Sequence, residues 1–190
     1  FQSGTFEGAA QISPEELSVT RERTRAGCVA CTIGCEHIYA IDGQGVRIEY
    51  ESLFALGSLC GISDAGAVLN ACRRCDELGL DTISTGGTIA FAMECVDRGF
   101  LDEPWLRFGD AGALLQAIEM IGRREGLGAL LAHGSRRAAE AIGHGSIAFA
   151  PQVKGLEIPG YEPRALQTMA LGFAVGARGA DHNRSGKDEL

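Results

Sequence analysis

The sequence predicts a mainly α-helical, multihelical protein with one small β-hairpin. Apolar residues recur at helical spacing through most of the chain after residue 63. One short segment has the strand–turn–strand pattern of a hairpin. Strands and helices do not alternate, and neither a P-loop nor a G-x-G-x-x-G sequence occurs, so a nucleotide-binding βαβ fold is disfavoured.

Composition narrows the class of protein further. The chain has 190 residues, of which 45% are hydrophobic and 22% charged, so it can bury a substantial core. The net charge of −8 argues against a nucleic-acid partner, because phosphates require a basic surface. The sequence contains no apolar stretch long enough for a membrane span and no secretion signal, so we expect no membrane partner and a cytoplasmic location.

The first third of the chain predicts one helix followed by the hairpin. Ser13, then Pro14 and two acidic residues, is a typical helix start, and the helix is expected to run to about Arg25. Two short strands, at 37–41 and 46–50, flank a turn sequence rich in glycine at 42–45.

The rest of the chain predicts helices, with one irregular segment. Helices are expected from the Ser63-Asp64 cap to Leu78, over 82–98, from about 114 to Gly126, over 127–142, and over 163–176, the last one buried. Short extended pieces are expected at 146–149 and 153–158.

The cysteine spacing near residue 30 is the most informative motif. Seven cysteines in a chain of this length do not form a disulfide scaffold, so clustered thiols indicate metal or redox chemistry. Cys28, Cys31 and Cys35 form a C-x2-C-x3-C run in a glycine-containing loop, which favours an iron–sulfur cluster. A zinc site completed by His37 is the weaker alternative, and three buried thiols the weakest.

The other cysteines carry less information. Cys72 and Cys75 form a second C-x2-C on one face of a helix, where they can supply a fourth ligand or a redox pair. Two half-buried structural thiols explain them at least as well. Cys60 and Cys95 have apolar neighbours and are expected in the core.

Three further polar positions are candidates for chemistry. Residues 76–81 look like a helix end with Gly79 at the C′ position, after which Asp81 caps the next helix. The N-terminus of that helix can host an anionic or polar ligand. Glu51 is a plausible buried carboxylate. Near the end, His182 can transfer protons, and two arginines can bind an anion, Arg178 and Arg184. Taken alone, that last segment reads as a solvated loop.

Together these segments resemble the aldehyde ferredoxin oxidoreductase family, the tungsten or molybdenum bis-pterin enzymes. The matching stretches occur in the family's order, at 28–35, 50–53, 76–94 and 178–184. The resemblance implies that residues 1–160 form a helical domain like the family's second, and that 161–190 begin its third. Family members are much longer, so we expect N- and C-terminal parts of the same enzyme, with the fourth cluster cysteine, as partners of this chain.

The resemblance also implies an activity and a role for each site residue. Family members oxidise aldehydes to carboxylic acids and pass the electrons through a 4Fe-4S cluster to ferredoxin. The cluster ligands would be Cys28, Cys31 and Cys35. The catalytic groups beside the metal would be Glu51 and His182. The pterin contacts would be Asp76, Gly79, Leu80, Asp81 and Arg184.

One alternative function stays open on the residues alone. The cysteine loop can belong to an iron–sulfur or zinc module that relays electrons or stabilises a fold, without catalytic activity of its own.

Overall fold

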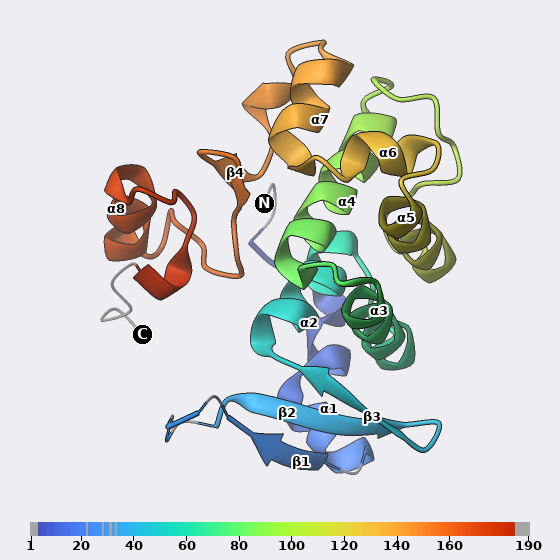
Figure 1. Ribbon diagram of the computed structural model, residues 1–190, viewed down its shortest axis with the longest axis vertical. Helices are drawn as coiled ribbons and strands as arrows, with labels where there is room; N and C mark the ends of the chain where they lie inside the picture. The colour runs from blue at the N-terminus through green and yellow to red at the C-terminus, as the bar shows by residue number, and fades with distance from the viewer. Residues whose placement is uncertain (1–3, 22, 28, 31, 33, 185–190) are drawn as a thin grey trace.

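The computed structural model is a helical body with a small sheet at one end and a helical tail set to one side (Figure 1). It describes residues 4–21, 23–27, 29–30, 32 and 34–184. The elements are η1 (Glu7–Ile12), α1 (Pro14–Thr20), β1 (Arg23–Ala26), β2 (Glu36–Ile41), β3 (Gln44–Ile48), α2 (Tyr50–Leu56), η2 (Ser58–Cys60), α3 (Ala65–Leu78), α4 (Thr82–Asp97), α5 (Ala111–Arg123), α6 (Leu127–Leu131), α7 (Gly134–Ile142), η3 (Ser146–Ala148), β4 (Gln152–Val153), β5 (Leu156–Glu157), α8 (Gln167–Val175) and η4 (His182–Arg184), where η is a 3-10 helix.

The helix at the N-terminus starts where the sequence predicts and ends earlier. The Ser13 hydroxyl accepts the Glu16 backbone N–H at 3.2 Å, which caps α1. The expected continuation to Arg25 is wrong, because α1 ends at Thr20 and β1 follows. The backbone groups of β1 pair with those of β2, with Arg23 opposite Tyr39, so a neighbouring strand satisfies them.

The predicted hairpin is confirmed and becomes part of a three-stranded sheet. β2 and β3 pair antiparallel across the turn Asp42–Gly43, whose φ angles of 48° and 76° are both left-handed. The order in the sheet is β1-β2-β3. The second strand ends at Ile48, because Tyr50 already begins α2.

Helix α4 is the centre of the fold and is buried on nearly all sides. It packs against α2, and a Cβ at Gly86 would overlap the backbone carbonyl oxygen of Ala55. Among the described residues, no single helix is long and apolar enough to cross a membrane; only α2 with η2 and α3, bent by 118°, pass that test as a pair.

Two expectations for residues 127–149 are corrected. The expected helix 127–142 is two helices, because Gly134 has a φ of +83° that no α-helix continues through. The segment expected as extended at 146–149 is the 3-10 turn η3. Within 153–158 the extended prediction is confirmed, since β4 and β5 form a short hairpin there.

The tail helix α8 is only partly covered. It is shorter than the expected 163–176, and the rest of the described chain packs on one side of it only. Leu171 and Val175 are therefore 62% and 71% exposed. Its buried side joins a second apolar cluster made of Met169, Phe173 and Ala180, with Val153, Leu156, Ile158, Tyr161 and Leu166 packed around them. This cluster contains residues from both sides of the boundary at 160, and the division into two domains stays a prediction.

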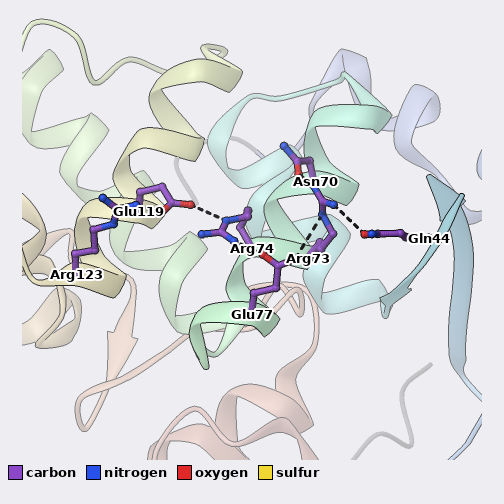
Figure 2. A network of polar contacts seen from close by, with 7 residues as sticks. All are labelled: Gln44, Asn70, Arg73, Arg74, Glu77, Glu119 and Arg123. Atoms are coloured by element: carbon purple, nitrogen blue, oxygen red, sulfur yellow. Dashed lines mark hydrogen bonds and ion pairs between the residues drawn. The ribbon is translucent and has the colours of Figure 1, made fainter. Parts of the chain in front are cut away.

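A polar network fixes α3 to its neighbours (Figure 2). Arg74 Nε donates to Glu119 Oε1 of α5 at 2.6 Å. Arg73 donates to Gln44, the first residue of β3, at 3.1 Å, and within α3 to Asn70 at 2.7 Å. These contacts hold α3 in place, and with it the junction of α3 and α4.

Candidate functional site

The first group of the site is a buried carboxylate. Glu51 lies in the first turn of α2 and is only 7% exposed. Its Oε2 accepts the backbone N–H of Gly160 at 2.8 Å. The helix start and the turn after β5 therefore hold this carboxylate from two directions, and the expected burial of Glu51 is confirmed.

The second group approaches Glu51 from the other end of the chain. His182, in η4, places Nε2 at 3.7 Å from Glu51 Oε1. The His182 side chain is only 14% exposed, although the arginines of its segment, Arg178 and Arg184, are exposed. The structure thus brings together the two residues that the family resemblance names as catalytic. Their catalytic role stays a prediction.

Sequence reasoning missed a third member of this group, Tyr161. Its ring stacks on His182, with centroids 5.4 Å apart and planes at 26°. Burial raises the pKa of the Tyr161 phenol, and the charge and hydrogen bond of Glu51 and the nearby Cys35 thiol raise it further. No spacing pattern marks Tyr161, because it follows a glycine and proline segment without periodicity.

The same observation brings Cys35 near the Glu51–His182 pair. Cys35 is exposed, directly precedes β2, and lies close enough to Tyr161 to influence its ionisation. An accessible thiol fits a cluster ligand, because a thiolate must reach the metal. Cys28 and Cys31 lie outside the described residues. Within the described ranges, no three His, Cys, Asp or Glu side chains gather closely enough to hold a metal ion.

The junction of α3 and α4 is an exposed surface built by local hydrogen bonds. Gly79 has a φ of 69° and ends α3, with Leu80 N–H donating to the carbonyl of Cys75 at 2.8 Å. Asp81 Oδ2 accepts the Ser84 N–H at 2.7 Å and caps α4. The helix-end interpretation of 76–81 is therefore confirmed.

The surface of this junction is open, and its role as a pterin contact remains a prediction. Asp76 and Asp81 are exposed, and no atom would lie within 4 Å of a Cβ at Gly79, so the surface above it is open. The exposed carboxylates can accept hydrogen bonds from ring nitrogens. Behind the junction, Thr82 and Ser52 share a hydrogen bond of 3.0 Å between their hydroxyls. The junction is thereby tied to the residue next to Glu51.

Arg184 is held by its own segment. Its Nε lies 3.6 Å from Asp181 Oδ2, which Arg178 also contacts at 3.0 Å. The Arg184 side chain is 74% exposed, so the guanidinium is accessible to an outside group. A pterin contact at Arg184 remains a prediction.

The remaining cysteines behave as structural thiols. Cys72 and Cys75 are 1% and 0% exposed. Burial raises the pKa of Cys75 to about 12, helped by Asp76 and Asp81, and raises that of Cys72 as well. Burial likewise raises the pKa of Cys60 and Cys95 to about 12. Since only thiolates bind metals or attack disulfides, the structural interpretation of all four is favoured.

Among solved structures, the fold is similar to the active site complex BamBC of benzoyl coenzyme A reductase. The match has a TM-score of 0.71 and 24% sequence identity, and it covers 86% of this chain and 26% of that chain. It shows that the two chains share an architecture.

The family model for aldehyde ferredoxin oxidoreductase, domains 2 and 3, matches residues 1–188. The chain therefore belongs to the aldehyde ferredoxin oxidoreductase family. It is 43% identical to the tungsten-containing aldehyde ferredoxin oxidoreductase of Thermococcus kodakarensis and 41% identical to that of Pyrococcus furiosus, over 96% of this chain in both cases. It is also 33% identical, over 70% of its length, to the WOR-like subunit of an aliphatic sulfonate oxidoreductase from Pyrococcus furiosus. The chain spans about 31% of the length of the first two relatives.

Proposed function

We propose that this chain is part of a tungsten-pterin oxidoreductase that oxidises aldehydes to carboxylic acids and passes the electrons through a 4Fe-4S cluster to ferredoxin. The observation that carries the proposal is the buried Glu51–His182 pair, with Oε1 and Nε2 3.7 Å apart. Family membership supplies the rest of the argument, because the relatives are named as tungsten-containing aldehyde ferredoxin oxidoreductases.

The proposed reaction needs groups that accept protons. An aldehyde and water give a carboxylic acid, two protons and two electrons. The tungsten-pterin centre supplies the two-electron acceptor when it is bound. Cys28, Cys31 and Cys35 would hold the cluster that takes the electrons onward one at a time, and molybdenum is the alternative metal.

Glu51 and His182 perform the proton chemistry in this proposal. Glu51 Oε1 accepts a proton from the reacting water or hydrated aldehyde, and His182 Nε2 carries it toward solvent. Gly160 N–H fixes the other carboxylate oxygen, so Oε1 keeps its direction toward the imidazole. Burial keeps bulk water away from Glu51. The exposed junction at Asp76, Gly79, Leu80 and Asp81, together with Arg184, would hold the pterin.

The test is preparation of the complete enzyme under anaerobic conditions with tungstate. We expect iron, tungsten and an oxidisable pterin in the protein, and aldehyde-dependent reduction of ferredoxin. Replacement of Cys28, Cys31 and Cys35 by serine should remove the iron. Zinc in place of iron, or a metal-loaded protein that leaves aldehydes unreacted, would contradict the proposal.

A further inference from the structure

Glu157 is a buried acidic residue that the proposed chemistry does not use. It ends β5 and is 3% exposed. Its Oε1 accepts three hydrogen bonds: from Ser135 N–H at 2.7 Å, from Ser135 Oγ at 2.9 Å and from Thr88 Oγ1 at 3.4 Å. The side chain thus joins the β4–β5 hairpin to the start of α7 and to the middle of α4.

The Glu157 side chain occupies space that is free because residues 87 and 134 are glycines. A Cβ at Gly87 would lie 3.1 Å from Glu157 Cβ and Cγ, and one at Gly134 would lie 3.0 Å from Oε1. Ser135 is in the first turn of α7, whose N-cap His133 makes no side-chain capping bond. Glu157 therefore serves as the cap of α7, supplied from a different element.

Gly160, which contacts Glu51, follows Glu157 by only three residues. Gly160 donates its N–H to Glu51 and accepts the Tyr50 hydroxyl through its carbonyl at 3.0 Å. Tyr161 then stacks on His182. An extended segment of three residues spans at most about 10 Å, so the anchor point limits where Gly160 and Tyr161 can lie.

The position of Glu51, the carboxylate of the pair, also depends on helix α4. Glu51 is on α2, which packs on α4 at the Ala55–Gly86 contact. Thr88 of α4, two residues further along, holds Glu157. Helix α4 is thus the common support for the carboxylate on α2 and for the segment that contacts it.

We propose that Glu157 is a positioning residue for the Glu51–His182 pair: through Ser135 and Thr88 it fixes the segment 158–161, and this segment keeps the imidazole of His182 beside the carboxylate of Glu51. The proposal rests on the proposed function for its catalytic meaning. The structural claim can be tested without any cofactor.

The pKa measured for His182 depends on the charged and titratable groups around it. Glu51 approaches from α2, and Tyr161 from the segment after β5, with Cys35 near that tyrosine. On its own segment the neighbouring charges are Asp181, Arg178 and Arg184. Among the described residues, no hydrogen bond or ion pair joins Glu157 to these groups. Glu157→Ala and Glu157→Gln remove the same charge, so the difference between them reports the position of the segment.

The test is an NMR titration of the 190-residue chain labelled at histidine, with His182 assigned from a His182→Gln sample. In Glu157→Ala we expect the midpoint of His182 to fall by about 0.5 pH unit or more, because the imidazolium loses the nearby carboxylate. His144 should keep its midpoint. Glu157→Gln retains an acceptor and should restore most of the wild-type value, and Ser135→Ala should give an intermediate shift.

The matched control is Glu140→Gln, which removes an exposed carboxylate of α7 that pairs with Arg136 at 3.1 Å. It should leave His182 unchanged. An unmoved His182 in folded Glu157→Ala, or an equal shift of His144, would overturn the proposal. If Glu157→Ala does not fold, the Ser135→Ala titration decides, and an unmoved His182 in that variant overturns the proposal. None of these readouts depends on aldehyde oxidation, so failure of the proposed function would be seen separately.

Discussion

The Glu51–His182 pair and the junction at 76–81 are built in opposite ways. The pair joins α2 to a segment at the far end of the chain, and the turn after β5 completes it. The junction is formed by hydrogen bonds within a few residues, such as Asp81 to Ser84 and Leu80 to Cys75. The first site is enclosed and the second is exposed.

The two sites therefore depend on different features of the molecule: the junction on local hydrogen bonds, and the pair on the packing of distant elements. The junction is formed mainly by hydrogen bonds within a few residues, and the Thr82–Ser52 hydrogen bond is its link to α2, so it depends less on distant packing. The pair needs α2, α4, the β4–β5 hairpin and the tail at once, so it is sensitive to changes in any of them. The predictions below test this contrast.

The largest effect is expected at Glu51. In the complete enzyme, Glu51→Gln should lower turnover by about 100-fold or more, because an amide cannot accept the proton. The measurement is steady-state aldehyde oxidation. The control is Glu49→Gln, a surface carboxylate paired with Arg47 at 3.0 Å, which should keep wild-type turnover. Full activity in Glu51→Gln would remove the pair from the mechanism.

A large effect on stability is expected at Gly86, where α4 meets α2. The added methyl of Gly86→Ala overlaps the Ala55 carbonyl, so we expect the free energy of unfolding to fall by about 3 kcal/mol. Urea denaturation of the 190-residue chain measures it. In Gly112→Ala the new Cβ meets only the end of the Asp110 side chain, at 3.2 Å, so the change should be within about 1 kcal/mol. Equal effects at the two glycines would contradict the close approach of α2 and α4.

A smaller effect is expected at the junction. Asp81→Ala removes the cap of α4 and should lower the free energy of unfolding by about 1 kcal/mol. Asp81→Asn keeps a capping oxygen and should retain most of that stability. Since the capping bond joins only Asp81 and Ser84, neither variant should move the His182 titration. A shift of His182 as large as that expected for Glu157→Ala would show that the two sites are coupled.

The smallest effect is expected at the surface pair of Glu162 and Arg164. The hydrogen bond from Arg164 lowers the pKa of Glu162 to about 2. The folded-state pKa is depressed, so the contribution to stability is present above the unfolded value of about 4.3 and is lost as the pH falls toward 2. Solvent screens this exposed pair, so Glu162→Gln should cost less at pH 7 than Asp81→Ala. Urea denaturation at a series of pH values should show a difference that shrinks below pH 4; a difference independent of pH would contradict the pairing.

Local signals allowed accurate prediction of several elements. Ser13, Asp64 and Asp81 cap helices as expected, because a capping side chain bonds to a backbone N–H three residues away. The turn at 42–43 forms as expected, because glycine tolerates the left-handed conformation. The prediction that the first helix reaches Arg25 was wrong, because residues 23–26 pair with β2 as a strand. The local sequence contains no sign of that pairing.

The site was predictable only in part. The resemblance named Glu51 and His182, and the structure places them together. Tyr161 and Glu157 carry no motif, because their roles arise from contacts with elements far away in sequence. The burial of α8 was overestimated for the same reason. A uniformly apolar sequence predicts a helix buried on all sides. In the described chain only one side of α8 is packed, and Leu171 and Val175 are exposed.

The sequence by itself determined the helix caps at Ser13, Asp64 and Asp81, the hairpin turn and the cysteine spacing, because each depends on side chains and backbone within a few residues. Only the tertiary structure decided that the carboxylate at 51, the imidazole at 182 and the ring at 161 meet in one enclosed place. Their meeting depends on how α2, the segment after β5 and the tail pack around α4, and packing is a property of the whole chain.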